Sequence, residues 1–413
     1  MDQHALTRLF RAEHGRIIAA MLCYTQDLDL IEDALQDACL QAIEQWPDKG
    51  QPNNLGAWLL TVTKRRMIDR MRRHHYQKSH PDSDVIIGKI EAKEEPLADD
   101  YEIEDEQLKL IFTCCHPALP RDSRIALTLK TLCGLSAREI ARAFLTSEPT
   151  MLQRLTRAKQ KIQRAAIPYH VPQGEQLSQR LPSVLEVIYL IYNESHTAME
   201  GQTLSREELA NEALRLTDLL QHTLSTPEVT GLKALMLFNE ARRSARVTST
   251  GDYIPLALQD RSAWHRHTIE EAHALLTAAL RQSAVGPYQL QAAISGLHCK
   301  APSWQQTDWL QIYALYQMLA TLQPSPVVAL NQCVALAYSG SPDKAYGQLN
   351  ALAPSLQRYQ PFFAAKAEIA SLLNRHDAAI DAYQCAIALT QNQVEQAYLA
   401  GKLEALKTHG EAG

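Results

Sequence analysis

The stretch that decides the fold is GLSAREIARAFLTSEPTMLQRLTRAKQKIQR, residues 134–164. Ser136 is followed three residues later by Glu139, which makes a capping box and predicts that a short helix begins there. Ser147 is placed to cap a second helix, and Pro149 is tolerated in its first turn because amides there have no partner inside the helix. Two helices joined so tightly are typical of a helix-turn-helix.

The second helix of this motif separates into an apolar face and a cationic face. Helical spacing predicts that the packed side chains are Met151, Leu152, Leu155, Ala158 and Ile162. The side chains expected to face outward are Gln153, Arg154, Arg157, Lys159, Lys161 and Arg164. A cationic helix with polar residues at its N-terminus meets the physical requirement for entering a DNA major groove. An ordinary surface hairpin would show the same pattern, so the rest of the chain has to decide.

Composition places the chain among globular helical proteins. Its 413 residues are enough for several domains and a large core, and 46% are hydrophobic while 21% are charged. Only 6% are aromatic, which together with abundant Ala and Leu favours helices. The net charge is −5, so any contact with nucleic acid must come from local basic patches.

The termini and the cysteines predict a cytoplasmic protein. The N-terminus lacks the pattern of a secretory signal, and no apolar run approaches the ~18 residues that span a membrane. The eight cysteines include no Cys-x-x-Cys pair and are expected to be reduced thiols.

We expect an all-α chain with several sections. Residues 1–75 form a first helical domain, residues 76–101 an acidic linker, residues 102–167 a second helical domain with the helix-turn-helix, and residues 183–413 a helical extension. From Glu91 to Glu106 nine acids stand against one lysine, which is typical of a solvated segment.

The end of the extension repeats with an offset of 34 residues. Ala345 aligns with Ala379, Leu349 with Tyr383, Leu352 with Ala386 and Gly340 with Asn374. A helical period of 34 is typical of tetratricopeptide-like (TPR-like) repeats, which bury a continuous core by stacking. An irregular helical array is the alternative.

The first domain combines an acidic helix with a basic one. In residues 27–46 the outer positions are acidic, and Leu40 and Ile43 are among the apolar residues expected to pack inward. Residues 54–75 carry six Lys and Arg against one Asp, the density that phosphate neutralisation requires. This division of charge suggests two partners of opposite sign, although a basic helix end alone is more often a solvated face.

Taken together, the two domains resemble a sigma factor of the extracytoplasmic-function type, a branch of the sigma-70 family. IEDALQDACLQAIEQW (31–46) looks like that family's polymerase-docking helix, and LGAWLLTVTKRRMIDRMRR (55–73) like its −10 reader. ALPRDSRIALTLKTLCGLSAREIARAFLTSEPTMLQRLTRAKQKI (118–162) resembles the domain that reads the −35 element. LIFTCCHPALP (110–120), VIYLIYNESHTA (187–198) and LALQDRSAWHRHTIEEA (256–272) resemble landmarks of a subgroup with a long TPR-like extension.

The resemblance implies partners and residues. Core RNA polymerase would bind Asp33, Gln36 and Asp37. The −10 element would be contacted by Trp58, Lys64, Arg65, Arg66, Asp69, Arg72 and Arg73. The −35 element would be contacted by Ser147, Glu148, Thr150, Gln153, Arg154, Arg157 and Lys161. The extension is expected to regulate the factor and could bind a protein or peptide.

Other chemistry is weakly represented. Cys114 and Cys115 are interpreted as buried structural thiols, since adjacent helix positions diverge by about 100° and do not converge on one metal. The sequence lacks a phosphate loop and a nucleophile elbow, so we expect no catalytic site, no metal and no cofactor. The alternative function is a helix-turn-helix regulator with a TPR-like interaction domain, which would not need the acidic and basic helix pair.

Overall fold

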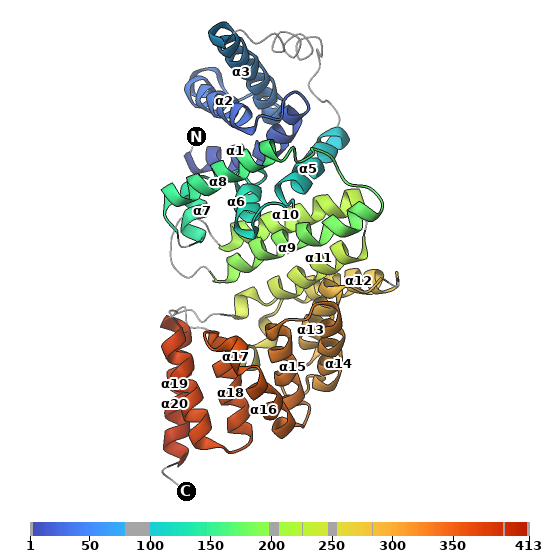
Figure 1. Ribbon diagram of the computed structural model, residues 1–413, viewed down its shortest axis with the longest axis vertical. Helices are drawn as coiled ribbons and strands as arrows, with labels where there is room; N and C mark the ends of the chain where they lie inside the picture. The colour runs from blue at the N-terminus through green and yellow to red at the C-terminus, as the bar shows by residue number, and fades with distance from the viewer. Residues whose placement is uncertain are drawn as a thin grey trace. The chain divides into compact units, whose positions relative to one another are not determined.

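The computed structural model describes residues 3–78, 100–144, 146–197, 206–224, 226–246, 254–282, 284–390 and 393–410 (Figure 1). All regular elements within these ranges are helical, as predicted. The chain divides into two compact units, Met1–Leu224 and Ser225–Gly413. Most of the predicted acidic linker, residues 79–99, lies outside the described residues. The finer domain bounds stay predictions.

The first unit begins with three packed helices, α1 (Gln3–Leu22), α2 (Leu28–Lys49) and α3 (Leu55–Lys78). Asp27 caps α2, because its carboxylate accepts hydrogen bonds from the backbone amides of Asp29 and Leu30, both at 3.1 Å. α2 packs extensively on α3, which sets the acidic helix beside the basic one. The fully buried side chains between the three helices include Ile17, Ile31, Leu59 and Met67.

The second group of helices carries the helix-turn-helix and consists of α5 (Asp100–Cys114), α6 (Arg121–Thr131), α7 (Ala137–Ala143) and α8 (Glu148–Arg164). The predicted capping box is present: the Glu139 amide donates to Ser136 Oγ at 3.2 Å, and the Ser136 amide donates to Glu139 Oε2 at 2.8 Å. Ser147 caps α8 by accepting from the Thr150 amide at 3.3 Å. The helix-turn-helix therefore begins and turns where its capping residues predict.

Two further helices, α9 (Glu175–Thr197) and α10 (Arg206–Leu224), pack on each other and on α5, and α9 also packs on α6 (Figure 1). Their side chains complete the end of α5, where carbonyls lack partners within the helix. Arg180 donates to the Phe112 carbonyl at 2.7 Å, and Ser183 donates to the Cys115 carbonyl at 2.8 Å. The start of the extension is thus part of the same compact unit as the helix-turn-helix.

The second unit is a succession of helices: α11 (Pro227–Glu240), α12 (Arg266–Leu280), α13 (Pro287–Lys300), α14 (Trp309–Leu322), α15 (Pro326–Tyr338), α16 (Pro342–Ala351), α17 (Ala353–Leu356), α18 (Gln360–Leu372), α19 (His376–Leu389) and α20 (Gln393–Gly410). Short 3₁₀ turns follow α11. One of them holds Arg261, which donates to the carbonyls of His298 and, at 2.7 Å, Ala301. The QDRSAW stretch (259–264) therefore ties this turn to the C-terminal end of α13.

The 34-residue repeat is present in the geometry of the second unit. α15 and α18 begin 34 residues apart, at Pro326 and Gln360, and α16 and α19 begin 34 apart as well. The turn between each pair uses a left-handed residue, Gly340 with φ +100° and Asn374 with φ +56°. Such a residue closes a helix C-terminus, so the aligned positions are structurally equivalent. The aligned side chains buried at the seams are Ala345, Leu349, Ala379, Tyr383 and Ala386.

Cys114 and Cys115 are buried, as predicted. Burial raises the pKa of the Cys115 thiol to about 12, and Cys114 Sγ lies 3.2 Å from Thr131 Oγ1. In the described part of the chain, no helix is both long enough and apolar enough to cross a membrane.

Candidate nucleic-acid interface

The outward face of α8 borders a groove of about 500 Å³. Thr150, Gln153, Arg157 and Lys161 are exposed along it, and the segment from Ala118 to Ser123 forms the opposite wall. The helix N-terminus, with exposed Ser147 and Glu148, lies at one end of this face. Exposed cations following an uncovered helix N-terminus form a surface suited to the phosphates and base edges of DNA.

Arg154 differs from its neighbours on this face, because it already has a partner. Its Nη1 lies 3.6 Å from Asp122 Oδ2 on α6, and its side chain is partly buried. Arg157 and Lys161 are therefore the most accessible cations of the predicted −35 set.

Two residues of α8 are placed opposite to the expectation. Leu152, predicted to pack inward, is 51% exposed, whereas the side chain of Lys159, predicted to face outward, is only 10% exposed. Lys159 lies four residues after Leu155 and one after Ala158, so it shares their inner face, while Leu152 falls beyond its edge. Lys159 is accommodated there because acidic side chains of α2 meet it.

The predicted −10 residues lie along α3 in two environments. Arg65, Asp69, Arg72 and Arg73 are exposed. The remaining three contact α2 or the end of α1: Arg66 donates to Gln41 Oε1 at 2.8 Å, Lys64 Nζ lies 5.2 Å from the centroid of the Tyr24 ring, and Trp58 packs edge-on against Trp46 at 5.2 Å. The cationic surface of α3 is thus concentrated toward its C-terminal half.

The predicted polymerase-binding residues share one stripe of α2. Asp33 and Asp37 both accept from Arg70 of α3 at 2.9 Å, while Gln36 is exposed. The hydrogen bond from Arg70 lowers the pKa of Asp37. The acidic and basic helices therefore neutralise part of each other's charge, and Arg70 is a residue that the sequence reasoning did not assign.

The same stripe of α2 carries apolar side chains that the sequence pattern assigns to the core. Leu40 is 58% exposed and Ile43 is 50% exposed. They follow Asp33 and Gln36 at helical spacing, so the exposed face combines carboxylates with two large apolar residues. Periodicity alone missed this surface, because both faces of α2 are apolar at this point of the helix.

Comparisons with known proteins identify three matching regions in the chain. Residues 9–76 match Sigma-70 region 2, residues 109–162 match Sigma-70, region 4, and residues 180–280 match a family of unknown function (DUF6596). The uncharacterized protein R00370 of Rhizobium meliloti (strain 1021) is 40% identical over 94% of this chain and 93% of that protein. No solved structure matches the chain.

Two named relatives match a smaller share of the chain. The probable RNA polymerase sigma factor RfaY of Xanthomonas campestris pv. campestris is 28% identical over 38% of this chain and 39% of that protein. The ECF RNA polymerase sigma factor SigM of Mycobacterium tuberculosis is 25% identical over 40% of this chain and 78% of that protein.

Regions 2 and 4, in this order on successive helical domains, define a transcription initiation factor that acts with RNA polymerase and promoter DNA. The chain belongs to the sigma-70 family, as a sigma factor of the extracytoplasmic-function type with a C-terminal helical extension.

Proposed function

We propose that this sigma factor divides promoter recognition among three surfaces, with α2 docking on core RNA polymerase, α3 contacting the −10 element and α8 contacting the −35 element. The extension regulates this activity, and the factor acts in the cytoplasm. The observation that carries the proposal is the presence of exposed cations on two separate helices beside an exposed, partly acidic stripe on a third.

On α8 the proposal assigns different tasks along the helix. Glu148, Thr150 and Gln153 lie in the first two turns, where a recognition helix meets base edges. Arg157 and Lys161 lie one and two turns further on and are exposed, which suits phosphate or guanine contacts. Ser147 is at the cap, so its backbone amide and that of Glu148, at the positive end of the helix, favour a phosphate.

On α3 the exposed arginines bind the phosphate backbone of the DNA while the promoter opens. Arg65, Arg72 and Arg73 provide the phosphate contacts, and Asp69 provides a polar edge. Trp58 is half-buried against Trp46, so it presents a fixed aromatic edge beside which a base could unstack. Extruding a base costs a few kcal/mol, which these contacts must offset.

On α2 the docking surface consists of Asp33, Gln36 and Asp37 with Leu40 and Ile43. The apolar pair supplies area to remove from water, at about 25 cal/mol per Å². The carboxylates mainly orient the complex and raise its association rate. Because Arg70 already binds both aspartates, polymerase must either displace it or use the remaining lone pairs of those carboxylates.

The test is to reconstitute core polymerase with the full-length chain, select duplexes from a randomised library and sequence those retained. Two sequence elements should emerge. Arg72→Gln with Arg73→Gln should blur only the −10 element, and Arg157→Gln with Lys161→Gln only the −35 element. The matched control is Arg281→Gln with Arg358→Gln, two exposed cations of the second unit that should affect neither. Equal blurring of both elements by either pair of variants would contradict the assignment.

Regulation by the extension is supported by its two-part construction. Its first helices, α9 and α10, pack on α5 in the first unit, and α9 donates hydrogen bonds to the Phe112 and Cys115 carbonyls, whereas α11 to α20 form the second unit. We expect a chain that ends after Ala166 to lose stability and transcription, because the Phe112 and Cys115 carbonyls lose their donors. A chain that ends after Leu224 should keep those bonds but show altered output. Unchanged transcription in both would leave the extension without a regulatory role. A protein or peptide partner of the extension stays a prediction.

A further inference from the structure

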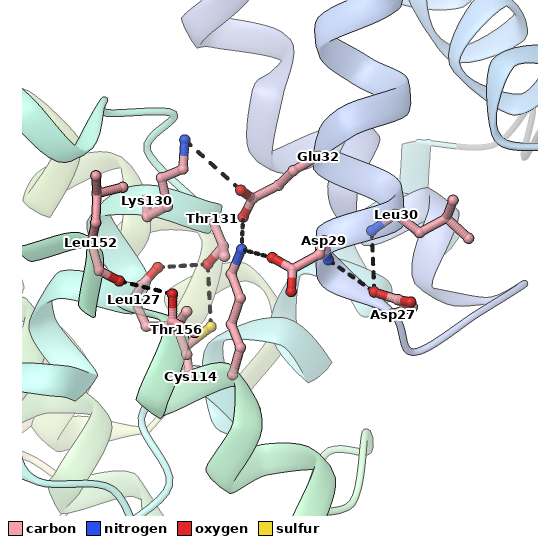
Figure 2. A network of polar contacts seen from close by, with 11 residues as sticks. Asp27, Asp29, Leu30, Glu32, Cys114, Leu127, Lys130, Thr131, Leu152 and Thr156 are labelled. Carbon is pink, nitrogen blue, oxygen red and sulfur yellow. Dashed lines mark hydrogen bonds and ion pairs between the residues drawn. The ribbon is translucent and has the colours of Figure 1, made fainter. Parts of the chain in front are cut away.

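The recognition helix and the polymerase-docking helix are joined by an ion-pair network. Lys159 Nζ of α8 lies 2.7 Å from Asp29 Oδ1 and 3.1 Å from Glu32 Oε1 of α2. Figure 2 shows these two carboxylates directed at α8, with Lys130 of α6 reaching Glu32 from the other side. The Lys130 Nζ to Glu32 Oε2 distance is 3.9 Å. Glu32 therefore connects region 2 to two helices of region 4.

The network is shielded unevenly from water. The side chains of Lys159 and Glu32 are 10% and 12% exposed, whereas that of Asp29 is 73% exposed. Burial alone lowers the pKa of Lys159, but the charges of Glu32 and Asp29 outweigh it and raise the pKa above the ordinary lysine value. A shielded pair that loses one partner leaves an uncompensated charge, so breaking it singly is costly.

A second contact between the regions relies on shape. A Cβ on Gly15 of α1 would overlap the Leu132 carbonyl, and a Cβ on Gly134 would press on the His14 side chain. Arg11 of α1 extends this contact, since its Nη2 lies 2.6 Å from Glu139 Oε1 of α7. Region 2 therefore touches region 4 at the start of the helix-turn-helix as well as at its recognition helix.

The extension also contacts region 2 and region 4 where they meet near the start of the helix-turn-helix. Arg11 Nη1 lies 3.8 Å from Glu208 of α10, and Arg215 of α10 donates to the Leu132 carbonyl at 3.2 Å. The loop that follows α6 is consequently held by α1 and by α10. α10, which packs on α9, is therefore placed to stabilise the arrangement in which α1 of region 2 covers the loop after α6 of region 4.

This arrangement is too compact for the two DNA readers to work together. Lys159 of α8 contacts Asp29 and Glu32 of α2 directly, and α2 packs on α3, so the two readers lie on the order of 20–30 Å apart by ordinary helix spacings. DNA rises about 3.4 Å per base pair, so that span covers roughly six to nine base pairs. The −10 and −35 elements are separated by about 25 base pairs, or about 85 Å. Gripping both requires α8 to leave α2.

We propose that Lys159, Asp29 and Glu32 form an ionic clasp that holds α8 against α2 in the free factor, which we call the closed form. Contacts of α10 with α1 and with the loop after α6 support this form, and the clasp opens when polymerase and promoter are bound. The inference rests on the proposed function. Cations freed on opening return to solvent, where DNA phosphates compete with the two carboxylates for Lys159. The exposed Asp29 makes the clasp sensitive to salt, and the shielded Glu32 gives it residual strength.

The test is single-molecule energy transfer in the full-length chain, with dyes on cysteines placed at exposed Asn53 and Gln163 and with Cys23 and Cys385 replaced by serine. The free protein should show one population of high transfer. Asp29→Asn with Glu32→Gln should shift the ratio of closed to open molecules at least tenfold toward open. The matched control, Glu44→Gln with Asp48→Asn, removes two exposed carboxylates from the same helix and should stay closed.

A charge exchange separates the clasp from general damage to the fold. Lys159→Glu should open the molecule, and adding Asp29→Lys with Glu32→Gln should close it again, because the cation and the carboxylate are then exchanged between positions 29 and 159 and Glu32→Gln removes the second carboxylate that would repel position 159. Any of three results would overturn the clasp. Asp29→Asn with Glu32→Gln could keep high transfer, the control variant could open equally, or the charge exchange could fail to restore closure. These readings use neither polymerase nor DNA, so their failure is distinct from a failure of the proposed transcription activity. Core polymerase added to the unaltered chain should lower the transfer, and unchanged transfer would also overturn the proposal.

Discussion

Acidification should open the first unit at the contact between α1 and the loop that follows α6. His14 packs there against Gly134, and its Nε2 is shielded from water without a hydrogen-bond partner. Burial, together with the charges of Lys130, Arg11 and Lys159, lowers the pKa of His14 from its ordinary value of 6.5 to about 3. The ring is therefore neutral while the contact is closed.

The sign and size of the effect follow from this difference in pKa. An open form that exposes His14 binds a proton below pH 6.5, whereas the closed form does so only near pH 3. The contribution of His14 to closure is fully present above pH 6.5 and is lost progressively as the pH falls from 6.5 toward 3. Between pH 7 and pH 5.5 the loss amounts to about 1.3 kcal/mol, roughly an eightfold change in the ratio of closed to open molecules.

The assay is the energy-transfer measurement between dyes at positions 53 and 163, repeated from pH 7.5 to pH 5. His14→Gln has no proton to gain in this range, so its ratio should lose most of the pH dependence even if the substitution itself shifts the equilibrium. The same ratio at pH 7 and pH 5.5 in the unaltered chain would refute the reasoning. An undiminished slope in His14→Gln would assign the effect to another group.

Three further predictions concern the DNA face, the docking face and the second unit. Replacing Arg157 and Lys161 by Gln should make the affinity for a 30-base-pair duplex less dependent on salt. The slope of log affinity against log salt should fall by about 0.9 for each phosphate that the variant no longer neutralises. An unchanged slope would remove these residues from the interface. Leu40→Ser should weaken binding to core polymerase by roughly tenfold in a fluorescence titration while leaving the thermal midpoint within a few degrees, since the side chain is exposed; full affinity would exclude it from docking. In the second unit, burial raises the pKa of Glu228 to about 7, and the carboxyl accepts from the Tyr288 amide at the start of α13. Its contribution to stability is therefore present below its unfolded value of 4.5 and lost as the pH rises through 7, so urea titrations should show a pH slope that Glu228→Gln abolishes; an identical slope in the variant would contradict this.

Local rules predicted the elements that depend on neighbouring residues. The capping box of Ser136 and Glu139 needs only three residues of sequence, and it is formed. The 34-residue offset correctly pairs Gly340 with Asn374, because each must adopt a left-handed conformation where one helix turns into the next. Such features follow from backbone geometry and can be recognised without knowledge of the tertiary structure.

Helical periodicity was less reliable at the edges of each apolar face. Leu152 and Lys159 exchanged roles because a rotation of the inner face by one position includes Lys159 and omits Leu152. Lys159 is tolerated inside only because Asp29, 130 residues earlier in the chain, and Glu32 meet it. A single sequence does not indicate which distant segments will meet, so the partner that decides this placement was not predictable.

The candidate site shows the same limit. The cationic positions on α3 and α8 were recognisable from composition, but their pairing was not. Arg70 forms ion pairs with Asp33 and Asp37, and Asp122 forms one with Arg154. The charge left accessible to partners is therefore smaller than the sequence suggests. Leu40 and Ile43 were assigned to the core because they are apolar, and only the packing of α2 on α3 reveals that they face solvent.

The central claim is that this chain gives core RNA polymerase its promoter specificity. The direct measurement is run-off transcription with purified core polymerase on promoters recovered from the library selection, with and without the full-length protein. We predict a single defined transcript that requires the chain and disappears when Arg157 and Lys161 are both replaced by Gln. Absence of a promoter-specific transcript with the unaltered protein, under conditions in which the same polymerase is active with another sigma factor, would contradict the account.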